Sequence, residues 1–509
     1  MSNNSNVNFQ KSHLRIPAVL TIIVAGLFGY FTYENEQQRR CDPYTKTFWN
    51  TLAEAETESC IAKIFENSEE GPERENLMRL AAQYARFPSI IHQLSDRGLS
   101  VNALFGKNAQ PLHMAAYYNP NPEIVTALLA HGAAIDQMNA DQRWPLFFAV
   151  RVNPNPDVAI AIIDAGADLE LVIDGGWTVL IDAVRLSANP KIITALLDAG
   201  ANLNSTTDSG KTSLHMAARY NENVDVTRAL LEAGANIEQD TGEGWRPLLY
   251  AVRYNPNPAI LAALLEAGAD ITASNDHGWT SLHLAAANAK DTVLIRTLLA
   301  AGADIDAGDV ENWTPLHRAV HENENVDVML ALLDAGADLD ARTERQWTPL
   351  LHALHYNSNT ALATALLDAG ADPTASGVRG WTSLHIAMEQ NLPISLTTRL
   401  LDLGADPNAA DIDGLTPLIK ELTKDPDVDA VTLLLQHGVD PNADIAAGWT
   451  PLHLALATGG PDVIYVMLEY GGDISIPFPV GGFSLSDIAS KNPKLADSPA
   501  LLQLLEDAQ

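Results

Sequence analysis

One spacing dominates the sequence and limits the folds open to it. A leucine recurs every 34 residues from position 112 to position 452, and a last one follows after 33. These marker leucines are Leu112, Leu146, Leu180, Leu214, Leu248, Leu282, Leu316, Leu350, Leu384, Leu418, Leu452 and Leu485. A glycine keeps the same step at Gly132, Gly166, Gly200, Gly234, Gly268, Gly302, Gly336, Gly370, Gly404, Gly438 and Gly472. A fixed period of this length predicts stacked repeats, each contacting only its neighbours.

The residues around the marker leucine indicate the kind of repeat. Gly-Trp-Thr-Pro-Leu-His at 448–453 is the fullest form, and variants stand at 278–283 and 380–385. Motif and period resemble the ankyrin repeat, a β-turn and two helices marked by Thr-Pro-Leu-His. The resemblance covers most of the chain and is to a 34-residue form common in bacterial ankyrin proteins. It implies an all-α repeat solenoid of about 13 stacked ankyrin repeats, each a helix-turn-helix plus a β-hairpin turn.

Local signals predict where the two helices of each unit begin and end. A threonine before proline should cap the first helix, with proline in its first turn. Nine residues after the marker leucine a side chain should cap the second helix, at Asn121, Asn155, Asn189, Asn223, Asn257, Asp291, Asn325, Asn359 and Asp427. The periodic glycine should end that helix in the left-handed conformation.

The ends of the chain depart from the repeat. We expect a disordered tail at 1–13, a transmembrane signal anchor at 14–33, an N-terminal capping half-repeat with a cysteine pair at 34–67, the array at 68–482 and a C-terminal capping repeat at 483–509. The anchor is predicted because 16–33 holds 18 residues without a charge, close to the length of a membrane-spanning helix. It lacks the Ala-x-Ala-like exit of a cleaved signal peptide. A signal peptide and a buried soluble helix remain alternatives.

The two cysteines bear on the orientation of that anchor. Basic residues before and after the apolar run are nearly balanced, so the positive-inside rule decides little. Cys41 and Cys60 could form a disulfide in an oxidising compartment; in the opposite orientation they would be reduced thiols. We therefore expect a single-pass inner-membrane protein with the array in the periplasm.

Charge and motifs narrow the classes of function. The formal charge is −33, which argues against nucleic acid, because such binding neutralises phosphates with Lys and Arg. No nucleophile elbow, phosphate-binding loop or His-Glu-x-x-His sequence occurs. We therefore expect no enzyme, no cofactor and no small-molecule substrate.

One repeat position carries a histidine: His113, His215, His283, His317, His385 and His453. Neighbouring helices lie about 8–10 Å apart, whereas a zinc–nitrogen bond is about 2 Å. Adjacent histidines therefore cannot share a metal ion. The ankyrin resemblance implies that each one hydrogen-bonds to the neighbouring turn.

Tryptophans form the first candidate binding row: Trp177, Trp245, Trp279, Trp313, Trp347, Trp381 and Trp449. The resemblance implies that they lie at the hairpin end of a concave groove, where ankyrin proteins commonly contact partners. Tryptophan is enriched in binding hot spots. The alternative is that each ring packs on the next hairpin and stiffens the stack.

Arginines form the second candidate row, five residues after the marker leucine: Arg151, Arg185, Arg219 and Arg253. Tyr220 and Tyr254 stand beside it, and this combination suits a carboxylate or an acidic peptide. The alternative is ion pairing between repeats, with acids such as Glu222 or Asp225. The sequence as a whole favours a non-enzymatic, membrane-anchored scaffold that binds a protein or peptide through its concave face. A secreted, toxin-like effector that engages a host target is the second hypothesis.

Overall fold

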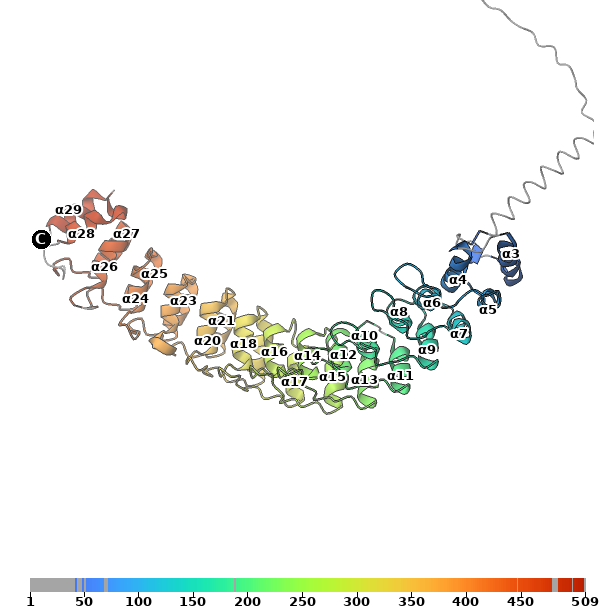
Figure 1. Cartoon of the computed structure of the whole chain (residues 1–509). Coiled ribbons are helices and arrows are strands. Elements are labelled where there is room, and N and C mark those ends of the chain that lie inside the picture. Colours follow the sequence, from blue (N-terminus) through green and yellow to red (C-terminus); the bar gives the residue numbers. More distant parts are fainter. Residues whose placement is uncertain are drawn as a thin grey trace, which may run out of the picture. The chain divides into compact units, whose positions relative to one another are not determined.

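The computed structural model describes residues 42–43, 48–49, 52–67, 72–186, 189–445, 447–477, 484–496 and 498–507. Over these residues the chain is all-helical, with 27 α-helices from α3 to α29, two short 3-10 helices and no β-strand. It divides into two compact units, residues 1–208 and 209–509. Each unit is a stack of helix pairs (Figure 1).

The helices of the first unit run from α3 to α11. Their bounds are α3 Glu54–Asn67, α4 Pro72–Tyr84, α5 Ser89–Asp96, α6 Pro111–Tyr118, α7 Pro122–Ala130, α8 Pro145–Arg151, α9 Pro156–Asp164, α10 Val179–Leu186 and α11 Pro190–Asp198. From α6 onward the even-numbered helix is the first of its repeat. In this unit α6 packs against α8 and α8 against α10, while α7 packs against α9 and α9 against α11. Two layers of helices result.

The second unit continues the alternation. Its helices are α12 Ser213–Tyr220, α13 Val224–Glu232, α14 Pro247–Tyr254, α15 Pro258–Glu266, α16 Ser281–Asn288, α17 Val293–Ala300, α18 Pro315–Glu322, α19 Val326–Asp334, α20 Pro349–Tyr356, α21 Thr360–Asp368, α22 Ser383–Glu389, α23 Ile394–Asp402, α24 Pro417–Leu422, α25 Val428–Gln436, α26 Pro451–Thr458, α27 Pro461–Glu469, α28 Leu485–Lys491 and α29 Pro499–Asp507. The 3-10 helices are η1 Val378–Gly380 and η2 Pro493–Leu495. The turns between repeats close as hairpins, with an antiparallel bridge such as that between Ser274 and Thr280.

The predicted caps are present, with one shift. Thr280, Thr314, Thr348, Thr416 and Thr450 each accept a hydrogen bond in the first turn of a first helix. The second helices are capped by Asn121, Asn155, Asn189, Asn223, Asn257, Asn325, Asn359 and Asp427. At the ninth site α17 begins one residue later than predicted, so that Thr292 is the N-cap. Asp291 still accepts a hydrogen bond from the Val293 N–H at 2.9 Å.

The periodic glycines end the second helices as predicted, except in the last repeat. From Gly132 to Gly438 their φ angles are positive, between 82° and 99°. In the last repeat Gly471, with φ 91°, takes this place instead of Gly472. The reason is a shorter connection before α27, where Gly460 rather than a ninth residue is the N-cap. The same missing residue explains the final interval of 33.

A row of buried and half-buried asparagines, which the sequence reasoning missed, ties successive repeats together. Each stands seven residues after a marker leucine and donates its side-chain N–H to carbonyls of the preceding repeat. Asn255 Nδ2, for example, lies 3.0 Å from both the Ala218 and the Asn221 oxygen. The others with such bonds are Asn119, Asn153, Asn323, Asn357 and Asn492. Since an unpaired buried carbonyl is costly, these bonds fix the stacking of the first helices.

Two predictions concern the N-terminal region. The predicted anchor at 14–33 lies outside the described residues. No helix among the described residues has both the length and the apolar character needed to cross a membrane. Cys60 lies in α3, is 7% exposed and is disulfide-bonded. Its predicted partner Cys41 lies outside the described residues, so that pairing stays a prediction.

Candidate functional site

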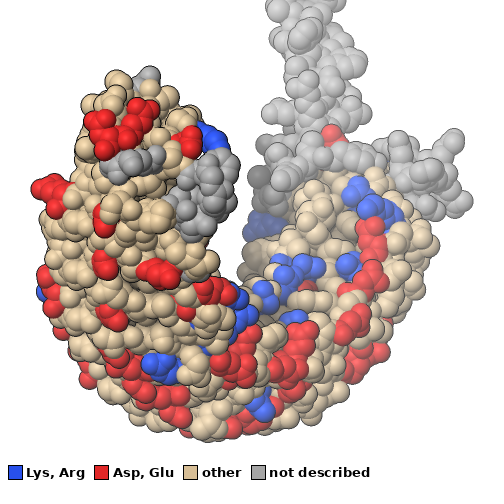
Figure 2. Space-filling view, turned by 90° about the vertical axis from the view of Figure 1, so that its left-hand side faces the viewer, with Lys and Arg blue, Asp and Glu red and all other residues tan. Residues whose placement is uncertain are grey.

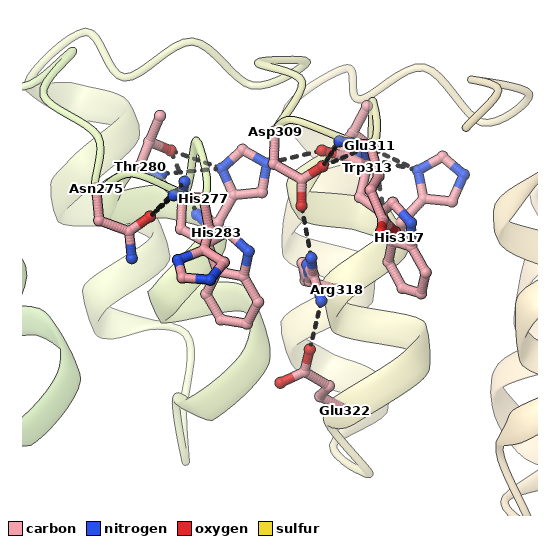
Figure 3. Close-up of polar contacts among 12 residues, drawn as sticks. Asn275, His277, Thr280, His283, Asp309, Glu311, Trp313, His317, Arg318 and Glu322 are labelled. Atoms are coloured by element: carbon pink, nitrogen blue, oxygen red, sulfur yellow. Dashed lines mark hydrogen bonds and ion pairs between the residues drawn. The ribbon is translucent and has the colours of Figure 1, made fainter. Parts of the chain in front are cut away.

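The periodic histidines link each first helix to the hairpin of the next repeat. His317 Nε2 lies 3.1 Å from the Trp347 carbonyl oxygen, and its Nδ1 accepts the Thr314 N–H at 3.2 Å. The same bond joins His283 to the Trp313 carbonyl at 2.8 Å (Figure 3). Burial lowers the pKa of His317 to about 4. The histidine is therefore neutral, with the hydrogen on Nε2, as its hydrogen-bond role requires.

The tryptophan row packs largely within the chain. All seven side chains are half-buried and contact residues of the first helices. The Trp313 ring lies 4.2 Å from that of His352, and the Trp245 ring 5.3 Å from that of Tyr250. Cations cover two further members: Arg185 lies over Trp177 and Lys420 over Trp381. These contacts favour the packing alternative, although each tryptophan remains partly exposed.

Arg318 makes the tightest of these contacts. Its guanidinium lies 4.0 Å from the ring centroid of Trp279 and 4.5 Å from that of Trp313. It also pairs with Asp309 at 2.5 Å and with Glu322 at 2.9 Å (Figure 3). The Asp309 carboxylate is 1% exposed. Arg318 is thus neutralised inside the chain and has little capacity left for a partner.

The arginine row is not uniform. In the first unit Arg151 and Arg185 both face the buried carboxylate of Asp182, at 3.4 and 3.6 Å. Burial raises the pKa of Asp182, and the two arginines oppose that rise. Ion pairing between repeats therefore occurs here, but with an acid the sequence reasoning did not name. Of the two acids that were named, Glu222 and Asp225, the latter lies near Arg228.

The two arginines of the second unit have a different environment. The Arg219 guanidinium lies 4.1 Å from the Tyr254 ring centroid, 4.9 Å from Tyr220 and 5.8 Å from Tyr250. Arg253 lies 5.4 Å from the Tyr254 ring and donates to Asn288 Oδ1 at 2.5 Å. Among the described residues neither arginine pairs with a carboxylate. Tyr220 and Tyr254 are 48% and 42% exposed, so this cluster lies open to solvent.

The regular hairpins and the histidine hydrogen bonds between them agree with a comparison of the sequence with protein-family models. A family model described as ankyrin repeats in three copies matches residues 77–173, 180–275, 248–343, 323–411 and 384–477. The chain belongs to the ankyrin-repeat family. Ankyrin repeats generally mediate protein–protein interactions. No curated protein matched the sequence.

Two hollows on the ankyrin repeats have several aromatic residues in their lining. One, of about 750 Å³, lies in the first unit beside Phe105, Tyr117 and Phe148. The other, of about 380 Å³, lies in the second unit beside Trp347 and Trp381. Residues of first helices and of hairpins line both hollows. Over the described residues no group of three or more His, Cys, Asp or Glu side chains could hold a metal ion.

The surface charge of this ankyrin chain is unevenly distributed. Figure 2 shows acidic side chains spread widely over the visible surface, with lysine and arginine in smaller groups. Among the described arginines, seven lie within 4.0 Å of a carboxylate: Arg151, Arg185, Arg228, Arg246, Arg318, Arg379 and Arg399. Arg219 and Arg253 are not among these seven, and their guanidiniums lie over exposed tyrosine rings instead.

Proposed function

We propose that this ankyrin-repeat protein is a non-enzymatic, membrane-anchored scaffold that binds a protein or peptide through the face formed by its first helices and hairpins. The observation that carries the proposal is the exposed cluster of Arg219, Arg253 and their tyrosines. A charged group held by aromatic rings and lacking an internal acid is poised to meet a partner. Arginine and tyrosine are also among the residues enriched in binding hot spots.

Affinity capture with the full-length, tagged chain tests the use of this face. The test variant is Tyr220→Ser with Tyr254→Ser, and the control is Leu330→Ser with Tyr465→Ser. The control residues are 37% and 43% exposed and lie on second helices. We expect the test variant to lose the proteins that wild type retains, while the control retains them. Loss in the control alone would place binding on the opposite face and reject the proposal.

We also propose that residues 16–33 anchor the protein in the inner membrane, with the array in the periplasm. Support comes from the length of the uncharged run and from the disulfide of Cys60, since disulfides persist in oxidising compartments. Fractionation with protease shaving tests this location. We expect a membrane-bound protein that is cleaved only after outer-membrane permeabilisation. Recovery from the culture fluid would favour the secreted effector instead.

A further inference from the structure

Four side chains form what we call the Arg–Tyr platform: Arg219, Tyr220, Arg253 and Tyr254. They are the last two residues of α12 and of α14, one repeat apart. These two helices pack directly against each other. The repeat therefore places the same pair of side chains twice on one face, at the carboxyl ends of neighbouring helices.

The platform carries positive charge that the chain does not neutralise. Arg219 makes no hydrogen bond or ion pair within the described residues, and its guanidinium lies near three tyrosine rings. Arg253 makes one hydrogen bond, to a neutral amide. A guanidinium has five N–H donors, so most donors of both groups remain open. Stacking on the tyrosines orients these donors before any ligand arrives, which lowers the entropy lost on binding.

The distance between the two arginines of the platform sets the distance between the ligand side chains that they bind. Neighbouring packed helices lie about 8–10 Å apart. Both guanidiniums lie over the Tyr254 ring, at 4.1 and 5.4 Å from its centroid, so they are at most about 9.5 Å apart. A polyproline II segment has three residues per turn and a rise of about 3.1 Å. Side chains at i and i+3 of such a segment therefore point the same way, about 9 Å apart. In a β-strand, side chains at i and i+3 would point to opposite faces.

The tyrosines favour the same conformation. Exposed aromatic rings in a shallow row are the surface on which proline-rich, polyproline II segments dock. Resting on the function proposed above, we propose that the platform binds an acidic, proline-containing peptide segment in the polyproline II conformation. Two carboxylates three residues apart would each accept hydrogen bonds from one arginine. The prolines between them would lie on Tyr220 and Tyr254.

Fluorescence anisotropy with the full-length chain and a labelled peptide tests the proposal. The probe is Pro-Glu-Pro-Pro-Glu-Pro-Pro-Glu-Pro. The first control peptide carries glutamine for glutamate, and the second carries glycine for proline. We expect the probe to bind about tenfold or more tightly than either control, because charge-assisted hydrogen bonds and preorganisation both contribute. Added salt should weaken binding of the probe.

Protein variants locate the site. Arg219→Ala with Arg253→Ala should weaken binding of the probe about tenfold or more. The control variant, Arg228→Ala with Arg399→Ala, removes the same charge from second helices and should bind the probe like wild type. Arg219→Lys with Arg253→Lys keeps the charge but loses the planar fork, and its affinity should fall between the two. The lysine variant tests the site if the alanine variant lowers the melting temperature.

Three results would overturn the inference. They are equal binding of the glutamine peptide, equal binding of the glycine peptide, and a wild-type affinity in both platform variants. If one of these occurs while Tyr220→Ser with Tyr254→Ser still abolishes protein capture, only the partner chemistry is wrong. If capture is also unchanged, the proposed function fails with it.

Discussion

The guanidinium of Arg318 lies over the indole ring of Trp279, the tryptophan of the preceding repeat, at 4.0 Å from the ring centroid. The two residues join α18 to the hairpin before α16. At this position of the tryptophan row, therefore, the cation that lies over the ring belongs to the repeat array and not to a partner. It also separates arginines that stabilise the array from those that remain open to a partner.

Arg318→Ala should destabilise the second unit by about 3 kcal/mol, because it leaves the buried Asp309 carboxylate without its partner. Thermal melting followed by circular dichroism measures the change. Arg399→Ala is the matched control, since it removes an exposed pair with Asp368 and should cost about 1 kcal/mol or less. If the two variants melt alike, the Arg318 contact is not structural.

Acidification should destabilise the array. Burial lowers the pKa values of His215 and His317 to about 4, below the ordinary value near 6.5. The unfolded chain therefore takes up protons first, so that stability is full above about pH 6.5 and falls as the pH drops towards 4. Each histidine contributes on the order of 3 kcal/mol over this window.

Urea unfolding between pH 8 and pH 4.5 measures that dependence. His317→Asn should unfold at lower urea than wild type at pH 8 but show a shallower dependence on pH, which separates the histidine from the many carboxylates. A urea midpoint that does not change between pH 7 and pH 5 would show that these histidines are not buried in neutral form.

Asn255→Ala should cost about 2 kcal/mol, because it removes hydrogen bonds to two carbonyls between α12 and α14 and leaves buried acceptors unpaired. Asn236→Ala is the control, since this asparagine is exposed and bonds only within its own turn. Its cost should be below about 1 kcal/mol. Hydrogen exchange of α12 and α14 would locate the effect, and unchanged protection there would count against the asparagine row.

Gly210→Ala should destabilise more than Gly234→Ala, although both glycines have positive φ. A Cβ at Gly210 would lie 2.5 Å from the Thr241 carbonyl oxygen, in the next hairpin, whereas a Cβ at Gly234 would have no neighbour within 4 Å. Gly234→Ala should therefore cost only the left-handed backbone strain, about 1 kcal/mol. Equal melting temperatures would show that the hairpins are not closely packed.

The features that repeat were predictable from the sequence, and those that vary between repeats were not. The period fixed the helix pairs, most of the caps and the histidine bonds, since each signal recurs many times. The residue two places after the marker leucine varies, and it is there that Asp182, Arg318 and His352 lie. Each of the three has a partner in the preceding repeat, namely Arg151, Trp279 and Trp313 in that order, so an average over the period hides them. The variation at the position two residues after the marker leucine, in a chain that is otherwise so regular, was the signal that the sequence offered.

The different environments of the four arginines in the row could not be predicted for the same reason, because they depend on residues that vary between repeats. Arg151 and Arg185 meet Asp182, whereas the corresponding neighbour of Arg219 is the neutral Tyr250. Spacing alone could not separate these pairs, because all four arginines share one repeat position. The contacts of the side chains decide which of them remain free.

Site-specific photo-crosslinking in the full-length chain tests most directly whether the Arg–Tyr platform is the binding face. A photoreactive phenylalanine replaces Tyr254 in one variant and Leu330, on α19, in another. If the Arg–Tyr platform is the binding face, position 254 gives a protein adduct that the acidic polyproline II probe suppresses, and position 330 gives none. An adduct from position 330 with none from position 254 would contradict this prediction.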